Sequence, residues 1–288
     1  MIGPTSKIIR PSHSPIKEES IPVSEEKLKN IINRLESDIA DNTWFHKDYA
    51  RMDLKMMPAL IAQANHKHPD MNLHFLMSPF DLPEEIEKNI AQGIESARFI
   101  INMGYSRMHC CVLDYKKIND KTSLILFEPV NFILTSPALL AVRVETALQK
   151  HPIPDCHLSL AEMDIQRSSS ECGIFSLALA KKLHTEQEYL SPLHEANING
   201  MLGSKNQPLQ YARIDPYLPA RFYKHTQSQG RLNEYLNANP MQKSTIVNKK
   251  NETLLLRASN NQSEVNGKII STSAHKKRIA EYKGLLKS

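Results

Sequence analysis

The chain has 288 residues, of which 41% are hydrophobic and 23% charged, and its formal net charge is +5, all within the range of ordinary globular proteins. No apolar run reaches the roughly 18 residues that a membrane span needs, and residues 1–20 lack the apolar core of a secretory signal peptide, so we expect neither a membrane span nor Sec export. The four cysteines are irregularly spaced without a C-x-x-C pair, which predicts free thiols and no bound metal.

Residues 1–23 carry four prolines among Ser, Lys and Glu, a composition that predicts a flexible tail. Ser24 then caps a segment with the apolar spacing of an amphipathic helix. The apolar positions of that segment are Leu28, Ile31, Ile32, Leu35 and Ile39. Further helices are predicted over 52–67 and 84–94. With no flexible linker farther along the chain, we expect a single domain over residues 24–288.

The middle of the chain alternates between short apolar runs and helical patterns. Strands are predicted over 97–103, 108–115, 123–127 and 157–165, and helices over 139–150 and 172–187. This alternation favours an α+β or α/β fold around a central sheet.

Beyond residue 190 the pattern weakens into short helical pieces and ends in a basic helix over 275–287. Residues 241–288 contain ten Lys or Arg against three acidic residues, a balance of +7, which leaves −2 for the first 240 residues. Such clustering is typical either of a site for a polyanion or of a solvated helical face.

The segment MDIQRSSSECGIFSLALAKKL is the most informative for chemistry, because a strand runs through a polar loop into a helix that begins beside Cys172. A thiol at a helix N-terminus feels the positive end of the helix dipole, which lowers its pKa and favours the nucleophilic thiolate. Cys172 is therefore the candidate nucleophile, and a small buried apolar residue is the alternative interpretation.

His109 lies inside one predicted strand and Glu128 follows the next. An antiparallel hairpin with its turn near Asn119 would therefore bring base and orienting carboxylate together. A merely packed histidine is the alternative, and Asp114 is the next carboxylate to consider. Gln166, six residues before Cys172, could form an oxyanion hole with the Cys172 backbone N–H. The order His, Glu, Gln, Cys is that of adenovirus-type and SUMO-protease-type cysteine peptidases.

Nine strings occur in order between residue 24 and the end of the chain: ARFIINMG, KTSLILFEP, IPDCH, EMDIQRSSSECGIFSLALAKKL, DPYLP, FYKHTQ, RLNEYL, IVNKKNET and HKKRIAEYK. Together they resemble the YopJ family of type III secreted effectors. The resemblance implies an α+β fold with a cysteine-peptidase-like (adenain- and SUMO-protease-like) core, whose central mixed sheet is flanked by helices. It also implies a helical regulatory region over about 190–288.

The activity that the resemblance implies is acetylation of Ser/Thr, and also Lys, residues of host MAP kinase kinases and IκB kinase. Acetyl-CoA is the implied co-substrate and inositol hexakisphosphate the implied activator. Such an effector is secreted by a type III system, acts in the host cell cytoplasm and suppresses immune signalling by blocking kinase activation. We expect no nucleic-acid partner and no integral membrane contact.

His109, Glu128 and Cys172 fall on the catalytic positions of the family. With His109, Arg167 and Ser168 are the candidate contacts for CoA. The candidate contacts for inositol hexakisphosphate are Lys181, Lys182, Lys224, His225, Arg257, Lys276 and Lys277. One departure from the family is the bulky segment 105–108 before His109, which bears on target choice.

Two other functions remain open from the sequence. A deubiquitinating or SUMO-type cysteine peptidase would use the same catalytic residues, with water as the acyl acceptor. A non-catalytic inhibitor would bind kinases and leave the catalytic residues unused. Neither the preferred kinase, nor the acetylated position, nor the oligomeric state follows from the sequence.

Overall fold

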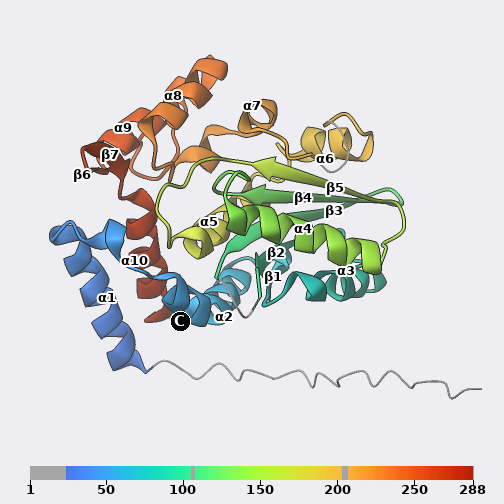
Figure 1. The fold of residues 1–288 in the computed structure, drawn as a ribbon, viewed down its shortest axis with the longest axis horizontal. Coiled ribbons are helices and arrows are strands. Elements are labelled where there is room, and N and C mark those ends of the chain that lie inside the picture. Colours follow the sequence, from blue (N-terminus) through green and yellow to red (C-terminus); the bar gives the residue numbers. More distant parts are fainter. Residues whose placement is uncertain (1–23, 105–107, 203–206, 288) are drawn as a thin grey trace, which may run out of the picture.

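The computed structural model describes residues 24–104, 108–202 and 207–287 (Figure 1). The predicted tail over 1–23 and residues 105–107 of the bulky segment lie outside these ranges. The centre of the fold is a five-stranded sheet in the order β1-β2-β3-β4-β5. Its strands are β1 (Leu73–Leu76), β2 (Ser96–Asn102), β3 (Cys110–Ile118), β4 (Lys121–Glu128) and β5 (Cys156–Glu162). The two inner pairings are antiparallel and the two outer pairings parallel, so the sheet is mixed.

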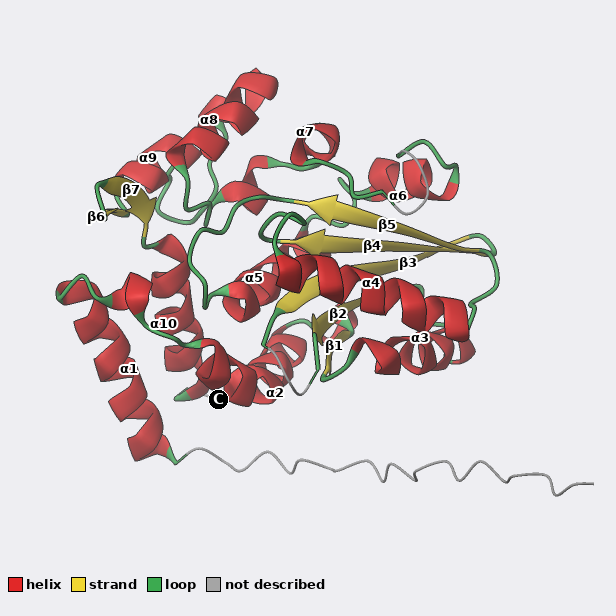
Figure 2. Ribbon diagram, viewed as in Figure 1, coloured by secondary structure: helices red, strands yellow, loops and turns green. Residues whose placement is uncertain are grey.

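Helices cover both faces of this sheet (Figure 2). The helices are α1 (Glu25–Ala40), α2 (Ala50–Lys67), α3 (Leu82–Ala91), α4 (Thr135–Lys150), α5 (Cys172–Thr185), α6 (Ser191–Ile198), α7 (Tyr211–Ile214), α8 (Gln229–Ala238), α9 (Leu254–Ser259) and α10 (Ser273–Leu285). Short 3₁₀ turns span Trp44–His46, Pro69–Met71, Pro79–Asp81, Asp215–Tyr217, Ala220–Tyr223 and Pro240–Ser244. A separate hairpin of β6 (Gln262–Val265) and β7 (Lys268–Ser271) precedes α10. The predicted α+β fold, with a central mixed sheet flanked by helices, is confirmed.

The middle of the sheet is largely apolar because both of its faces are buried, with the paired Arg98 and Asp114 as charged exceptions. Alternate residues of β4 enter two different cores: Ile125 and Phe127 pack with α2 and α5, whereas Leu124 and Leu126 pack with α3 and α4. The first of these cores extends from Leu28 in α1 to Tyr282 in α10, so both ends of the described chain are anchored in the same apolar cluster.

The structure differs from the sequence-based expectations in three places. His109 precedes β3 by one residue and does not lie inside a strand. The four-residue strand β1 was not predicted, because it is too short to show a period. The C-terminal region holds the β6–β7 hairpin among its helices, and the turn of this hairpin is an Asn266-Gly267 pair with φ of 51° and 72°, the strongest short-range hairpin signal.

Three further observations bear on the expectations. In residues 24–104, 108–202 and 207–287, no helix combines the length and the apolar character needed to cross a membrane. All four cysteines are free thiols. Among the residues that the structure describes, no group of three or more His, Cys, Asp or Glu side chains is placed to hold a metal ion.

Candidate catalytic site

The β3–β4 hairpin places His109 and Glu128 at its open end, as the turn near Asn119 predicts. Antiparallel pairing runs from Ile118 opposite Lys121 at the turn to Val112 opposite Phe127, and Asn119 turns the chain with φ of 55°. His109 Nε2 lies 2.8 Å from Glu128 Oε2, and both side chains are buried.

The Glu128 carboxylate has a second fixed contact, because the Val130 backbone N–H donates to Oε1 at 3.1 Å. Asp114, the other carboxylate considered, is buried in a different cluster, where it pairs with Arg98 at 3.0 Å and His194 at 3.1 Å. Glu128 is therefore the carboxylate that orients His109.

Cys172 is the first residue of α5 and is 3% exposed. Its pKa lies well below the ordinary value of a thiol: a hydrogen bond from the Cys110 side chain favours the thiolate, burial opposes it, and the hydrogen bond and positive charge of His109 favour it again. Cys110 is a contact that sequence reasoning missed, since nothing in the CC pair distinguishes one thiol from the other.

Burial works against a charged imidazole, but the Glu128 carboxylate and the Cys172 thiolate outweigh it and raise the pKa of His109 to about 10. The two shifts have the same origin, since each charged partner stabilises the other. Both shifts favour an imidazolium beside a thiolate, which is the arrangement of an activated nucleophile.

A pocket of about 670 Å³ opens beside His109. The loop after β4 and the first turn of α4 form one wall, and the loop over 164–169 forms the other. Gln166 lines this pocket; its Nε2 donates one hydrogen to the Ser168 carbonyl at 2.6 Å, and its Oε1 is buried without a partner. An amide nitrogen carries two hydrogens, so one N–H of Gln166 remains for an oxyanion.

The two predicted CoA contacts on this loop differ in their surroundings. Arg167 lies on the pocket wall, where its guanidinium pairs with Asp164 through contacts of 2.9 Å. Ser168 is buried, and its hydroxyl donates to Glu171 at 2.6 Å, so its side chain organises the loop. Gln227, which sequence reasoning missed, accepts from the backbone N–H groups of both residues at 2.5 and 2.9 Å. Gln227 is about sixty residues away from them in the sequence, so no local pattern predicts these contacts.

The candidate residues for inositol hexakisphosphate come from α5, the segment over 223–225, α9 and α10. Burial and the positive charges of Lys182, Lys277 and Arg257 lower the pKa of Lys224 to about 7, so these three cations act on Lys224 electrostatically. Lys277 also pairs with Glu281, and Arg257 pairs with Glu252. We call Lys182, Lys224, Arg257 and Lys277 the basic cluster.

The other candidates lie around the basic cluster. Lys276 lies near Arg257 and near Lys250. Lys250 was not among the residues predicted from the sequence. Lys181 pairs with Glu281 at 2.7 Å. His225 is buried; its Nδ1 contacts Ser273 Oγ at 2.8 Å, and burial together with the neighbouring cations lowers its pKa.

Comparison with known proteins gives a consistent result along the whole chain. The family model described as YopJ Serine/Threonine acetyltransferase matches residues 28–284. The chain is 58% identical over 287 residues to the serine/threonine-protein acetyltransferase YopJ of Yersinia pestis, and equally to that of Yersinia pseudotuberculosis, with 100% of each protein covered.

Solved structures resemble the fold as well. AvrA delL154 with IP6 and CoA is 53% identical, with a TM-score of 0.87 over 91% of this chain and 98% of that chain. HopZ1a in complex with IP6 and CoA is 17% identical, with a TM-score of 0.71 over 92% of this chain and 99% of that chain, and supports the fold alone.

Proposed function

Because the chain belongs to the YopJ serine/threonine acetyltransferase family, we propose that it transfers acetyl groups from acetyl-CoA to protein hydroxyls through Cys172. The observation that carries this assignment is the buried contact of 2.8 Å between His109 and Glu128, beside a thiol at the start of α5 whose pKa is lowered. The pocket next to His109 offers space for the thioester end of acetyl-CoA. Arg167 at its wall is the candidate for a CoA phosphate.

In the first step, the Cys172 thiolate attacks the thioester carbon of acetyl-CoA. The carbon–sulfur bond to CoA breaks, and the CoA sulfur takes the proton from the His109 imidazolium. We propose that Gln166 Nε2 and the Cys172 backbone N–H stabilise the oxyanion formed on the way.

In the second step, neutral His109 accepts the proton of the acceptor hydroxyl while its oxygen attacks the acetyl-cysteine. The Cys172 thiolate leaves and the imidazolium is regenerated, with Glu128 stabilising its charge. Because CoA departs before the acceptor reacts, the kinetics should be ping-pong.

Replacing Cys172 with alanine tests the covalent step. Cys172→Ala removes the attacking atom but only one small group, so acetyl transfer should be abolished while the fold is kept. The measurement is incorporation of labelled acetyl-CoA into a kinase acceptor, with circular dichroism as the check on folding. Cys156→Ala, at the start of β5, is the matched control and should stay active. Near-wild-type transfer by Cys172→Ala would end the covalent mechanism.

The same variant separates the alternatives. A peptidase would cleave ubiquitin or SUMO isopeptides in a manner that depends on Cys172 and would leave the kinase unlabelled. If the protein were a non-catalytic inhibitor, the wild type and Cys172→Ala would block kinase activation equally well.

We also propose that inositol hexakisphosphate activates the enzyme by binding the basic cluster and its neighbours in the regulatory region over about 190–288. Dense phosphate groups are best met by several Lys and Arg side chains from different elements. The proposal is supported by Lys182, Arg257 and Lys277, which belong to α5, α9 and α10 and act electrostatically on Lys224. The AvrA structure, which contains IP6 and CoA, supports both ligands. Calorimetric titration with inositol hexakisphosphate tests this, and absence of binding would contradict it.

The proposed acceptors are host MAP kinase kinases and IκB kinase, reached by type III secretion into the host cell cytoplasm. The family assignment supports this proposal. Mass spectrometry of these kinases after exposure to the wild type and to Cys172→Ala tests it, and acetylation of other host proteins alone would overturn it. Met108 lines the pocket, which supports a role of the segment over 105–108 in target choice.

A further inference from the structure

Arg278 of α10 is fully buried between α2 and the loop that leads to the nucleophile. Its guanidinium donates to both Asp53 carboxylate oxygens, with Nε at 2.9 Å from Oδ1 and Nη2 at 3.0 Å from Oδ2. The same side chain donates to the Ser170 carbonyl at 3.2 Å and to Glu171 Oε1 at 3.2 Å. One side chain therefore joins the C-terminal helix, α2 and the catalytic loop.

The two carboxylates that Arg278 binds lie directly beside the nucleophile. Glu171 precedes Cys172 and is 1% exposed. Asp53 lies against the next residue, since a Cβ added to Gly173 would stand 3.4 Å from Asp53 Cβ. Two buried carboxylates with no cation between them are strongly disfavoured, so the first turn of α5 depends on this guanidinium.

Glu171 also organises the rest of the catalytic loop. Its Oε2 accepts from the Ser168 hydroxyl at 2.6 Å and from Gln227 Nε2 at 2.5 Å. This loop carries Gln166 at one end and Cys172 at the other, so the distance between oxyanion donor and nucleophile depends on how Glu171 is held. A planar guanidinium meets two carboxylates and a carbonyl at once, which a lysine ammonium on a single stem does not reproduce.

We propose that Arg278 is a positioning residue for Cys172, which joins Glu171 and the Ser170 carbonyl to Asp53 and so fixes the turn on which the thiol stands. Lys277, its neighbour in the sequence, belongs to the basic cluster, so α10 connects the proposed anion site to the nucleophile. The link from the anion to the thiol rests on the proposed function. The positioning of the thiol does not.

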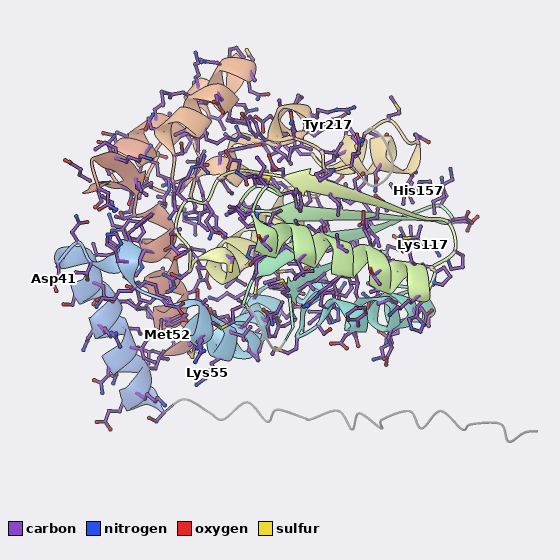
Figure 3. All side chains as sticks on the ribbon, in the orientation of Figure 1. Asp41, Met52, Lys55, Lys117, His157 and Tyr217 are labelled. Atoms are coloured by element: carbon purple, nitrogen blue, oxygen red, sulfur yellow. The ribbon has the colours of Figure 1, made fainter. Side chains whose placement is uncertain are left out.

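Figure 3 shows which end of the sheet lies farther from α10. The labelled Lys117 and His157 mark the end of the sheet farthest from α10, near the β3–β4 turn and the start of β5. The ends of β4 and β5 that lead toward the catalytic loop point toward α10 (Figure 1). The helix α10, which carries Arg278, therefore lies toward the catalytic end of the sheet.

The test compares Arg278→Gln, Arg278→Lys and the control Tyr282→Phe, which removes a hydrogen bond of 2.7 Å to Asp53 but none to the catalytic loop. Arg278→Gln should lower kcat for acetyl transfer about 100-fold, the cost of a nucleophile displaced by about 1 Å. KM for acetyl-CoA should change little, Arg278→Lys should be intermediate, and Tyr282→Phe should resemble the wild type. The rate at which iodoacetamide alkylates Cys172 should fall in the same order.

Glu171→Gln provides the second test, since it keeps the shape of the side chain and removes its charge. If Arg278 acts through Glu171, the double variant should be no slower than Arg278→Gln alone. Multiplicative losses, or wild-type kcat and alkylation in a folded Arg278→Gln, would overturn the proposal. If Arg278→Gln does not fold, wild-type kcat and alkylation in Glu171→Gln would overturn it.

Alkylation needs neither acetyl-CoA nor inositol hexakisphosphate. A failure of the proposed function, seen as a wild type that transfers no acetyl group, is thereby distinguished from a failure of the positioning role. With inositol hexakisphosphate added, Arg278→Gln should keep the affinity for the anion because the basic cluster is intact. The anion should no longer raise its rate, as it should in the wild type and in Tyr282→Phe.

Discussion

At the scale of single residues, folding moves one proton within the His109 and Cys172 pair, from the thiol to the imidazole, and does not release it. The ordinary pKa values are 6.5 for imidazole and 9.0 for the thiol. Between pH 6.5 and pH 9.0 the unfolded pair therefore holds one proton, on sulfur. The folded pair also holds one proton, on nitrogen. Equal proton numbers mean that this pair makes stability independent of pH in that interval. Below about pH 6.5 the unfolded pair binds a second proton, so the contribution of the pair to stability falls as pH falls.

Replacing Glu128 with glutamine removes the charge that holds the proton on His109. Glu128→Gln should lower the rate of acetyl transfer by about 10²- to 10⁴-fold, as in other catalytic triads whose orienting carboxylate is lost. In the wild type, alkylation of Cys172 by iodoacetamide should depend only weakly on pH, because Cys110 and His109 lower the pKa of the thiol. In Glu128→Gln it should rise steeply with pH. A rate and a pH profile like those of the wild type would remove Glu128 from the mechanism.

Which site residues the sequence could predict follows from how each is positioned. His109 and Glu128 are brought together by a short local hairpin, and Cys172 begins a helix, so a local pattern reveals each. The contacts of Arg278 and Gln227 with the catalytic loop span 107 and 56 residues or more, and only the folded chain displays them. Their residue types carry no signal of their own.

At the scale of elements, the basic cluster brings like charges from α5, α9, α10 and the segment over 223–225 near one another. Burial and the neighbouring cations lower the pKa of Lys224 to about 7, against an ordinary value of 10.5. The unfolded chain binds the Lys224 proton more tightly than the folded chain does. Without an anion, Lys224 therefore disfavours folding below about pH 7, and this effect disappears as pH rises to 10.5.

Binding of a polyanion should raise the pKa of Lys224 again, because an opposite charge favours the ammonium form. At pH 8 Lys224 in the free protein has lost most of this proton, so Lys224 should take up a proton when inositol hexakisphosphate binds. Calorimetry in buffers of different ionisation enthalpy measures this uptake. Lys224→Met should reduce the uptake and, without the anion, raise the melting temperature. The control is Lys283→Met, an exposed lysine of α10 paired with Glu36. Uptake unchanged in Lys224→Met would contradict the prediction.

The elements themselves were predictable where burial dictates the residue types. The central strands are apolar on both faces and α1 carries one apolar stripe, so each shows its period in the sequence. Strands β1, β6 and β7 have four residues each, too few for a period to stand out. The position of β1 is fixed by pairing with β2. Strands β6 and β7 pair with each other across the Asn266-Gly267 turn, a local signal that the sequence analysis did not use.

At the scale of the whole molecule, the C-terminal region and the catalytic core share one apolar cluster that extends from α1 to α10. We therefore expect a ligand that binds α10 to act on the packing of α5, and through Arg278 on the catalytic loop. Such coupling is reciprocal: each ligand must change the affinity for the other by the same factor.

Neutralising Lys182 and Lys224 together should weaken binding of inositol hexakisphosphate and of acetyl-CoA, although neither residue lines the pocket. Calorimetry of each ligand with and without the other measures the coupling factor, which is typically about 5- to 150-fold. High salt should reduce the affinity for the anion by screening. The iodoacetamide reactivity of Cys172 should stay high. Acetyl-CoA affinity that ignores the anion in the wild type would refute the coupling.

The β3–β4 hairpin also determines which changes of length the protein tolerates. His109 and Glu128 lie at the open end, so residues added at the Asn119 turn leave the distance between them untouched. A single residue deleted within either strand turns every following side chain to the opposite face. Natural variants of this chain should therefore accept insertions and deletions at that turn, whereas within β3 and β4 their lengths should be invariant.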